Sequence, residues 1–265
     1  MNTALRADAT VPDTRGLDTA WWSRRDAGGP TLVLLHEGLG SIELWRDFPQ
    51  RLVDATGLAA FAYTRAGYGR SRPCEMPRPL DYLHREALDV LPRMLDEQGI
   101  GDCVLIGHSD GATIAAIHAG LARDPRVLGI VLIAPHYFVE KLCLDVLAQV
   151  RDTYETSGLR RRMARYHDDV DMAFRGWNDI WLSGAFRGFD LSDALSGITV
   201  PVLQIQGRDD PYATWAQPEM ADRLVRGPIR TVAPAARHAP HLEAVDETMA
   251  EIVAFIVDVR GNSGS

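Results

Sequence analysis

One stretch of this sequence, residues 102–124, constrains the fold of the chain more than any other. It begins with a short apolar run at 103–106, which has the length and the β-branched content of a strand. Residues 112–122 are small and apolar and favour a helix. Between the two lies Gly-His-Ser-Asp-Gly at 107–111, so a strand is predicted to lead into a helix through a sharp turn with Ser109 at its apex.

The two glycines of this turn, Gly107 and Gly111, serve its geometry. A turn this sharp forces Ser109 into a strained backbone conformation and crowds the neighbouring chain, where a Cβ would clash. The strained turn exposes the hydroxyl, and the N–H groups at the start of the helix point at the group that it attacks. Because Gly-x-Ser-x-Gly also occurs by chance, a catalytic serine needs partner residues elsewhere in the chain.

Length and composition predict one α/β domain with an insertion. The chain has 265 residues, of which 46% are hydrophobic, and this is enough to bury a large core. No run approaches the ~20 apolar residues of a membrane span, and residues 1–13 lack the apolar core of a signal peptide. We therefore expect a soluble, cytoplasmic protein that does not bind a membrane.

The charge and the cysteines disfavour several other classes of protein. A net charge of −8 argues against non-specific binding to nucleic acid, because the phosphates would repel such a surface. The three cysteines, Cys74, Cys103 and Cys143, are odd in number and far apart, and one lies in a predicted buried strand. They support neither a disulfide framework nor a zinc site. The expected partner is a small-molecule substrate.

Strands and helices alternate along most of the chain, which is typical of an α/β fold with a doubly wound, mostly parallel sheet. Strands are predicted at 17–25, 31–35, 58–63, 103–106, 127–134, 200–205 and 229–232. Helices are predicted at 44–56, 83–98 with a kink at Pro92, 112–122 and 242–257.

The alternation breaks between residues 136 and 196. This segment has helical runs rich in charged and aromatic residues and no predicted strand, so we interpret it as a helical insertion. Packing against the sheet accounts for most of its aromatic side chains, but some should face a pocket. The candidates are Tyr137, Phe138, Trp177 and Trp181, and of these Trp177 and Trp181 are predicted to bind substrate.

Three loops that follow predicted strands carry residues suited to nucleophilic catalysis. Along the chain these are Ser109, then the pair Asp209 and Asp210, then His238. A serine hydroxyl needs a base with a pKa near neutrality, and a histidine in this role needs a carboxylate that fixes its tautomer. Parallel strands all end at the same edge of a sheet, so these residues can converge there.

These features together resemble the α/β-hydrolase family over about residues 31–257, apart from the insertion. The turn at Ser109, the chain order of serine, acid and histidine, and a helical cap after strand six all match the family pattern. The resemblance implies that Ser109 is the nucleophile and His238 the base. It implies Asp210 as the acid, with Asp209 as the alternative. The family usually places this carboxylate three residues after the glycine that ends strand seven in the family's numbering, which here is the strand at 200–205.

The same resemblance divides the chain and predicts an oxyanion hole. Residues 1–135 and 197–265 form the two parts of the hydrolase core, and residues 136–196 form the cap. The oxyanion hole uses two N–H groups, one of which is that of Asp110. The other comes from the loop after strand three in the family's numbering, here the loop after residues 31–35, and belongs to Gly38 or, alternatively, to Leu39. The family more often has His-Gly in this loop, whereas this chain has His-Glu. Glu37 is then either a solvated carboxylate beside the helix or a pocket residue that contacts a polar substrate.

Two features make opposite predictions about the charge of the substrate. Some relatives with Ser-Asp-Gly at the turn cleave amino-acid esters and bind the ammonium group with the acid, so Asp110, together with Glu37, would prefer a cationic or polar group. A basic run in the cap would instead attract an anion or form a solvated helix face; its members are Arg160, Arg161, Arg162 and Arg165.

The sequence thus predicts a serine hydrolase that cleaves an ester, thioester or lactone through an acyl-enzyme, with no metal and no organic cofactor. Dehalogenase and epoxide hydrolase chemistry is disfavoured, because those relatives have an aspartate in place of Ser109. Hydrolysis of a carbon-carbon bond of the ring-cleavage type is the alternative within enzymes. A ligand-binding protein with low turnover on the same fold is the alternative from another class.

Overall fold

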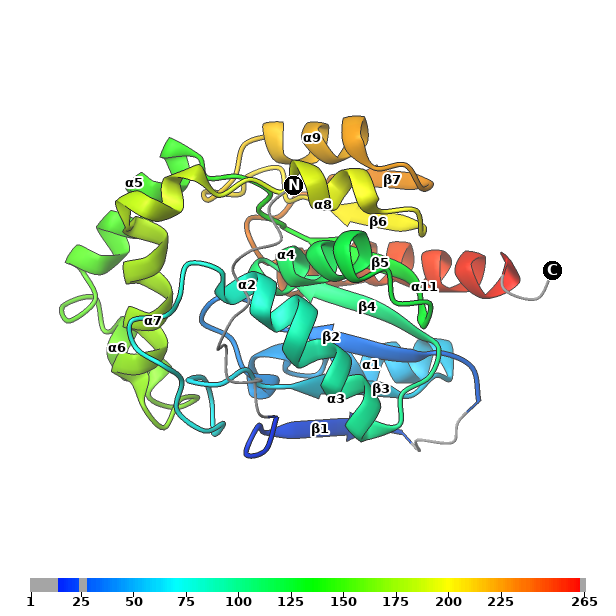
Figure 1. Cartoon of the computed structure of the whole chain (residues 1–265), viewed down its shortest axis with the longest axis horizontal. Coiled ribbons are helices and arrows are strands. Elements are labelled where there is room, and N and C mark those ends of the chain that lie inside the picture. Colours follow the sequence, from blue (N-terminus) through cyan, green and yellow to red (C-terminus); the bar gives the residue numbers. More distant parts are fainter. Residues whose placement is uncertain (1–13, 24–27, 263–265) are drawn as a thin grey trace, which may run out of the picture.

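A mixed sheet of seven strands forms the centre of the protein, whose computed structural model describes residues 14–23 and 28–262. The strands are β1 (Thr19–Trp22), β2 (Thr31–Leu35), β3 (Ala60–Tyr63), β4 (Cys103–His108), β5 (Val127–Ile133), β6 (Val202–Ile205) and β7 (Ile229–Val232). Their order across the sheet is β1-β3-β2-β4-β5-β6-β7, and only the pairing of β1 with β3 is antiparallel. The predicted α/β fold class is confirmed (Figure 1).

Helices cover both faces of this sheet, because its central strands are apolar on both sides. Along β2, for example, Val33 contacts one apolar cluster and Leu34 the other. One face is covered by α1 (Phe48–Thr56) and α11 (Val245–Asn262). The other is covered by α2 (Tyr82–Arg85), α3 (Leu91–Gln98), α4 (Asp110–Ile117), α8 (Ser192–Gly197) and α9 (Ala216–Leu224).

Several helices differ in detail from the prediction. The segment predicted as one helix at 83–98 consists of α2, a π-helical turn η2 (Glu86–Val90) and α3. Pro92 lies in the first turn of α3, where its missing N–H costs little, and the π-helical turn comes directly before α3. Residues 44–56 are likewise divided between a 3₁₀ turn η1 (Ile42–Trp45) and α1.

The insertion between β5 and β6 is helical, as predicted. It contains α5 (Lys141–Asp152), α6 (Leu159–Met163), α7 (Val170–Leu182), a 3₁₀ turn η4 (Gly184–Gly188) and α8. Helices α5, α6 and α7 form a cap beyond the carboxyl ends of the parallel strands (Figure 1). The strand that precedes the cap, strand six in the family's numbering, is the fifth strand, β5, in the described part of this chain.

The last helix of the insertion packs on the core. Helix α8 lies against the π-helical turn η3 (His118–Ala122), which continues α4. A Cβ on Gly120 would come 1.9 Å from the carbonyl oxygen of Ala194, and a Cβ on Gly197 would come 2.1 Å from that of Gly120. The backbones therefore touch, and α8 ties the end of the insertion to the helix that follows Ser109.

Among the described residues, no helix is both long enough and apolar enough to span a membrane. The expectation that residues 1–13 contain no signal peptide concerns a segment outside the described part of the chain.

Candidate active site

Ser109 lies at the turn between β4 and α4, in the strained conformation that the sequence predicts. Its φ and ψ angles are 52° and −117°, and its main-chain N–H donates to the carbonyl of Ile133, 2.8 Å away. A Cβ on Gly111 would lie 1.9 Å from the carbonyl oxygen of Leu35, and one on Gly107 would lie 2.3 Å from that of Gly111. Only glycine permits this close approach of the turn to the neighbouring strand.

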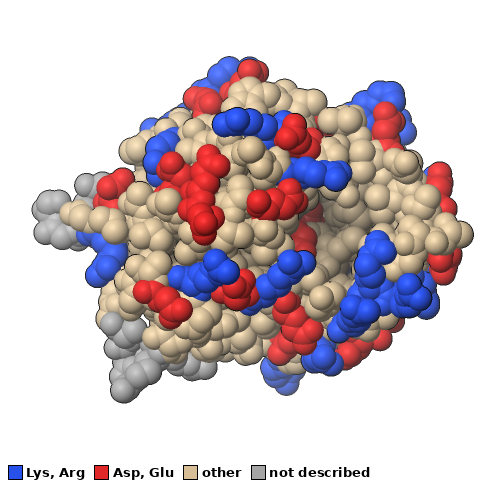
Figure 2. Space-filling view, turned by 180° about the vertical axis from the view of Figure 1, so that it is seen from behind, with Lys and Arg blue, Asp and Glu red and all other residues tan. Residues whose placement is uncertain are grey.

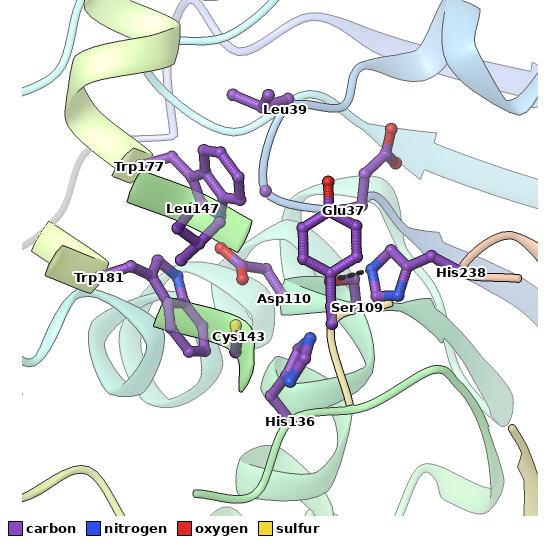
Figure 3. A pocket seen from close by; sticks show the side chains of 12 residues that line it. Glu37, Leu39, Ser109, Asp110, His136, Cys143, Leu147, Trp177, Trp181 and His238 are labelled. Carbon is purple, nitrogen blue, oxygen red and sulfur yellow. Dashed lines mark hydrogen bonds between the residues drawn. The ribbon is translucent and has the colours of Figure 1, made fainter. Parts of the chain in front are cut away.

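The structure brings Ser109, His238 and Asp210 together at the carboxyl edge of the sheet. His238 Nε2 lies 3.0 Å from Ser109 Oγ, and His238 Nδ1 lies 2.8 Å from Asp210 Oδ2. A carboxylate can only accept, so Nδ1 carries the proton and Nε2 is left to accept from the serine hydroxyl. This is the geometry of a serine activated by a general base (Figure 3).

Asp210 is held in place by groups other than the histidine. Gln206 Nε2 donates to its Oδ2 at 2.8 Å, and the N–H of Tyr212 donates to its Oδ1 at 2.9 Å. Burial alone would raise the pKa of Asp210, but the hydrogen bonds from His238 and Tyr212 hold it below its usual range. The alternative acid, Asp209, is exposed to solvent. The structure thus places Asp210 against the histidine.

The main chain of His238 has a support of its own. His108 Nε2 donates to the carbonyl oxygen of His238 at 2.8 Å, and the two rings lie 5.2 Å apart. The other ring nitrogen of His108 lies 3.6 Å from the carboxylate of Glu37. Burial would raise the pKa of Glu37, but His108 lowers it. His108 therefore lies between Glu37, in the loop after β2, and the loop that carries His238.

The loop after β2 carries the predicted oxyanion donors, and buried polar contacts fix its course. The guanidinium of Arg65 donates to the carbonyls of His36 and Glu37, and the main-chain N–H of Arg65 donates to His36 Nε2 at 3.0 Å. Gly38 follows directly and lines the same cavity as Ser109. A Cβ on Gly38 would lie 2.2 Å from Nε1 of Trp177, so only glycine fits beneath the cap there.

Asp110, the other predicted donor, supplies one of the first N–H groups of α4. Such groups have no carbonyl partner within the helix and carry its positive dipole end. The side chain is 1% exposed, and its Oδ2 accepts from the Tyr82 hydroxyl at 2.7 Å. Its Oδ1 has no hydrogen-bond partner within the described part of the chain. Burial raises the pKa of Asp110, although the charge of Arg65 and the Tyr82 hydrogen bond oppose this.

A cavity of about 110 Å³ lies between these loops and the cap (Figure 3). Its lining consists of Glu37, Gly38, Leu39, Ser109, Asp110, His136, Cys143, Leu147, Trp177, Trp181, Tyr212 and His238. Both tryptophans predicted to bind substrate are therefore in its wall. Of the other two aromatic candidates, Tyr137 is buried and donates its hydroxyl to Gln204 Oε1 at 2.6 Å, away from the cavity.

Four lining residues were not among the predicted site residues. Tyr212 lies two positions after Asp210, and its ring is 4.7 Å from that of His238. Cys143 and Leu147 lie on α5 one helical turn apart, a spacing that indicates a shared face but not a pocket. Burial raises the pKa of the Cys143 thiol to about 12, so the thiol stays protonated. His136 is the only other histidine among the residues that line the cavity.

The basic run of the cap lies outside this cavity. Arg160 donates to Asp171, with Nη2 2.7 Å from Oδ2, and Arg162 donates to the carbonyl of Ser157. Figure 2 shows basic side chains gathered on the cap near α6, beside a hollow in that face, and charges of both signs interspersed elsewhere.

Within the described residues, no cluster of histidine, cysteine and carboxylate side chains could hold a metal ion.

A strained serine lies beside a histidine and a buried carboxylate at the edge of a mostly parallel sheet, which is the arrangement expected of a hydrolase on an α/β fold. Residues 32–252 match the model of the alpha/beta hydrolase family. The chain belongs to this family and is a hydrolase.

Curated relatives match most of the chain at low identity. RutD of Variovorax paradoxus, which is named as a carbamate hydrolase, is 28% identical over 239 residues, covering 81% of this chain and 86% of that protein. RutD of Pseudomonas savastanoi pv. phaseolicola is 31% identical over 212 residues, covering 72% and 80%. The human serine hydrolase BPHL is 26% identical over 229 residues, covering 83% and 77%.

Solved structures share the fold. A proline iminopeptidase from Mycobacterium smegmatis superposes with a TM-score of 0.73 at 19% identity, covering 97% of this chain and 100% of that one. The enol-lactonase of Burkholderia xenovorans LB400 also superposes with a TM-score of 0.73 at 19% identity, covering 91% and 96%. At this identity the likeness concerns the fold alone.

Proposed function

We propose that the protein is a serine hydrolase that cleaves an ester, thioester or lactone through an acyl-enzyme. The observation that carries this proposal is the position of the His238 ring, with one nitrogen 3.0 Å from Ser109 Oγ and the other 2.8 Å from Asp210. This arrangement lines a cavity of about 110 Å³ that can hold a small acyl group.

In the first half of the reaction, His238 Nε2 takes the proton of Ser109 as the oxygen attacks the substrate carbonyl. The N–H groups of Gly38 and Asp110 hold the oxyanion that develops there. The bond to the leaving group then breaks, and the leaving atom takes the proton from His238. In the second half, His238 removes a proton from water, which attacks the acyl-enzyme. The bond to Ser109 Oγ then breaks, His238 returns the proton to Ser109, and the acid is released.

The proposed mechanism suits several types of bond. Esters, thioesters and lactones all present a carbonyl and a leaving group that needs one proton, which His238 supplies. The relatives named as carbamate hydrolases make a carbamate a reasonable further arm of any substrate test. The small volume of the cavity, about 110 Å³, favours a small acyl group over a long chain.

Asp110 is the lining residue best suited to select a charged substrate. Its Oδ1 is buried, has no hydrogen-bond partner within the described part of the chain, and belongs to a residue in the cavity wall. A substrate ammonium or other donor would satisfy this oxygen and offset the cost of burying a carboxylate. Glu37, although it faces His108, adds negative charge to the same wall. We therefore propose that the acyl side of the substrate carries a cationic or hydrogen-bond-donating group.

A fluorophosphonate probe tests the triad directly. We expect the wild-type protein to be labelled at Ser109, and Ser109→Ala to lose the label and to lower kcat by about 10⁴-fold or more. A screen of esters, thioesters, lactones and carbamates of different charge and length then identifies the bond. An unlabelled wild-type protein with no turnover in the screen would instead identify a ligand-binding protein on this fold.

Paired amino and des-amino esters test the role of Asp110. We expect Asp110→Ala to lower kcat/KM about 10- to 100-fold more for the amino ester, because only that substrate loses a charged hydrogen bond. The main-chain N–H at this position is present in both proteins, so loss of the oxyanion donor does not enter the comparison. Equal losses on both esters would contradict the proposed role.

A further inference from the structure

His136 is a buried polar residue of the cavity wall that the proposed mechanism leaves without a role. It follows β5, is 4% exposed, and its ring lies 5.7 Å from that of His238 and 5.4 Å from that of Trp181. Its Nδ1 has no hydrogen-bond partner among the described residues. Figure 3 shows the ring pointing into the cavity, toward Ser109 and His238.

The main chain of His136 is fixed to the helix that follows Ser109. The Thr113 hydroxyl donates to the His136 carbonyl at 2.9 Å and lies 3.3 Å from its N–H. The N–H of Thr113 in turn donates to the carbonyl of Ser109 at 2.9 Å. His136 is therefore positioned relative to the nucleophile by one intervening residue, as a preorganised substrate contact would be.

The imidazole of His136 is neutral at the pH where His238 acts as a base. Burial, together with the charge that His238 can carry, lowers the pKa of His136 to about 3. A neutral imidazole has one N–H donor and one acceptor nitrogen and does not compete with His238 for the serine proton. A residue that served only as a packing partner of Trp181 would need no nitrogen at all.

The order of strands decides which part of the substrate His136 can reach. β4, which carries Ser109, has β2 on one side and β5 on the other. Gly38 follows β2 and His136 follows β5, so the proposed oxyanion donor and His136 lie on opposite sides of the nucleophile. With the oxyanion directed to Gly38, the leaving atom lies near His238 Nε2, on the side of His136.

We propose that His136 is a specificity-determining residue, whose ring N–H donates a hydrogen bond to the leaving atom of the substrate. This inference rests on the proposed hydrolase function and deepens it. As the carbonyl bond breaks, the leaving atom keeps the electron pair and takes its proton from His238, while His136 keeps its own proton and stabilises the developing charge. The benefit is largest for leaving groups of high pKa, on which most charge must be neutralised.

Two esters of one acid, with alkoxide and p-nitrophenoxide leaving groups, test this inference. His136→Phe keeps a ring against Trp181 and removes the donor. We expect kcat/KM, which reports acylation, to fall about 10- to 100-fold more for the alkyl ester than for the p-nitrophenyl ester. The amide nitrogens of His136→Asn and His136→Gln can replace Nδ1 and Nε2 respectively, and the variant that replaces the donating nitrogen should recover part of the loss. The rate of labelling by the fluorophosphonate, whose leaving group is fluoride, should be unchanged.

The controls separate this inference from the proposed function. If His136→Phe lowers both esters and the labelling rate equally, or none of them, His136 only packs, and the inference is wrong while the hydrolase function stands. If the wild-type protein is neither labelled nor active on either ester, the proposed function fails, and the role of His136 fails with it.

Discussion

The two ring nitrogens of His238 have different hydrogen-bond partners. Nε2 faces the Ser109 hydroxyl, and Nδ1 donates to Asp210, which fixes the tautomer. The adjacent Asp209 has the same charge and lies one residue away, but its side chain is exposed. The two aspartates are therefore adjacent carboxylates of the same charge, of which Asp210 is buried against the histidine and Asp209 is not.

We expect Asp210→Asn to lower kcat by about 10⁴-fold, because an amide at this position can stabilise the wrong tautomer of His238. Asp209→Asn removes the same charge from the same loop and should leave kcat nearly unchanged. Steady-state kinetics of both variants on one ester give the comparison. Similar losses in the two variants would show that the loop, and not the Asp210 carboxylate, matters.

At the scale of elements, α4 is seated unusually close to β2. The helix begins directly after Ser109, and a Cβ on Gly111 would lie 1.9 Å from the Leu35 carbonyl oxygen. β2 cannot move away from the helix, since it pairs with β3 and β4 and is fully buried. The position of Ser109 thus depends on one glycine in the first turn of α4.

Gly111→Ala should therefore lower the free energy of unfolding by about 3 kcal/mol or more, since overpacking against backbone leaves no side chain to move. Gly101→Ala is the control, because a Cβ there has nothing within 4 Å and its effect should stay within about 1 kcal/mol. Urea unfolding of both variants measures the difference. Equal midpoints for the two would mean that α4 shifts without cost.

The whole molecule buries several imidazoles, both near the carboxyl edge of the sheet and elsewhere. Burial lowers the pKa of six histidines below the ordinary 6.5, and the value for His136 is about 3; the six are His36, His84, His118, His136, His167 and His241. Burial raises the pKa of the Asp110 and Glu86 carboxyls, so these two groups bind a proton more readily in the folded chain than in the unfolded chain.

We expect acid to destabilise the protein from about pH 6.5 downward. Between 6.5 and the lowered folded pKa values, the unfolded chain binds more protons than the folded one, so stability falls as the pH falls. The stability is fully present above 6.5, and each histidine removes at most about 1.4 kcal/mol per pH unit below it. Urea midpoints at pH 7.5 and 5.5 measure the loss, and a constant or higher midpoint at 5.5 would contradict it.

Local patterns account for most of what could be predicted. Apolar runs and helical spacing predicted the seven strands and the helical insertion, because burial imposes these periods on any sheet covered by helices. The π-helical turns η2 and η3 were missed, since a change of helix type leaves no periodic signal over five residues. The packing of α8 on η3 was also missed, because it depends on backbone contact at Gly120 and Gly197.

The sequence by itself determined the strand-turn-helix at Ser109 and the chain order of serine, acid and histidine, since both depend on residue type within short windows. Only the tertiary structure decided that Asp210 faces His238 while Asp209 faces solvent, that Glu37 turns to His108, and that His136 enters the cavity. The reason is physical: a side chain's partners across a sheet edge are set by how separate loops pack, and no local period records that packing.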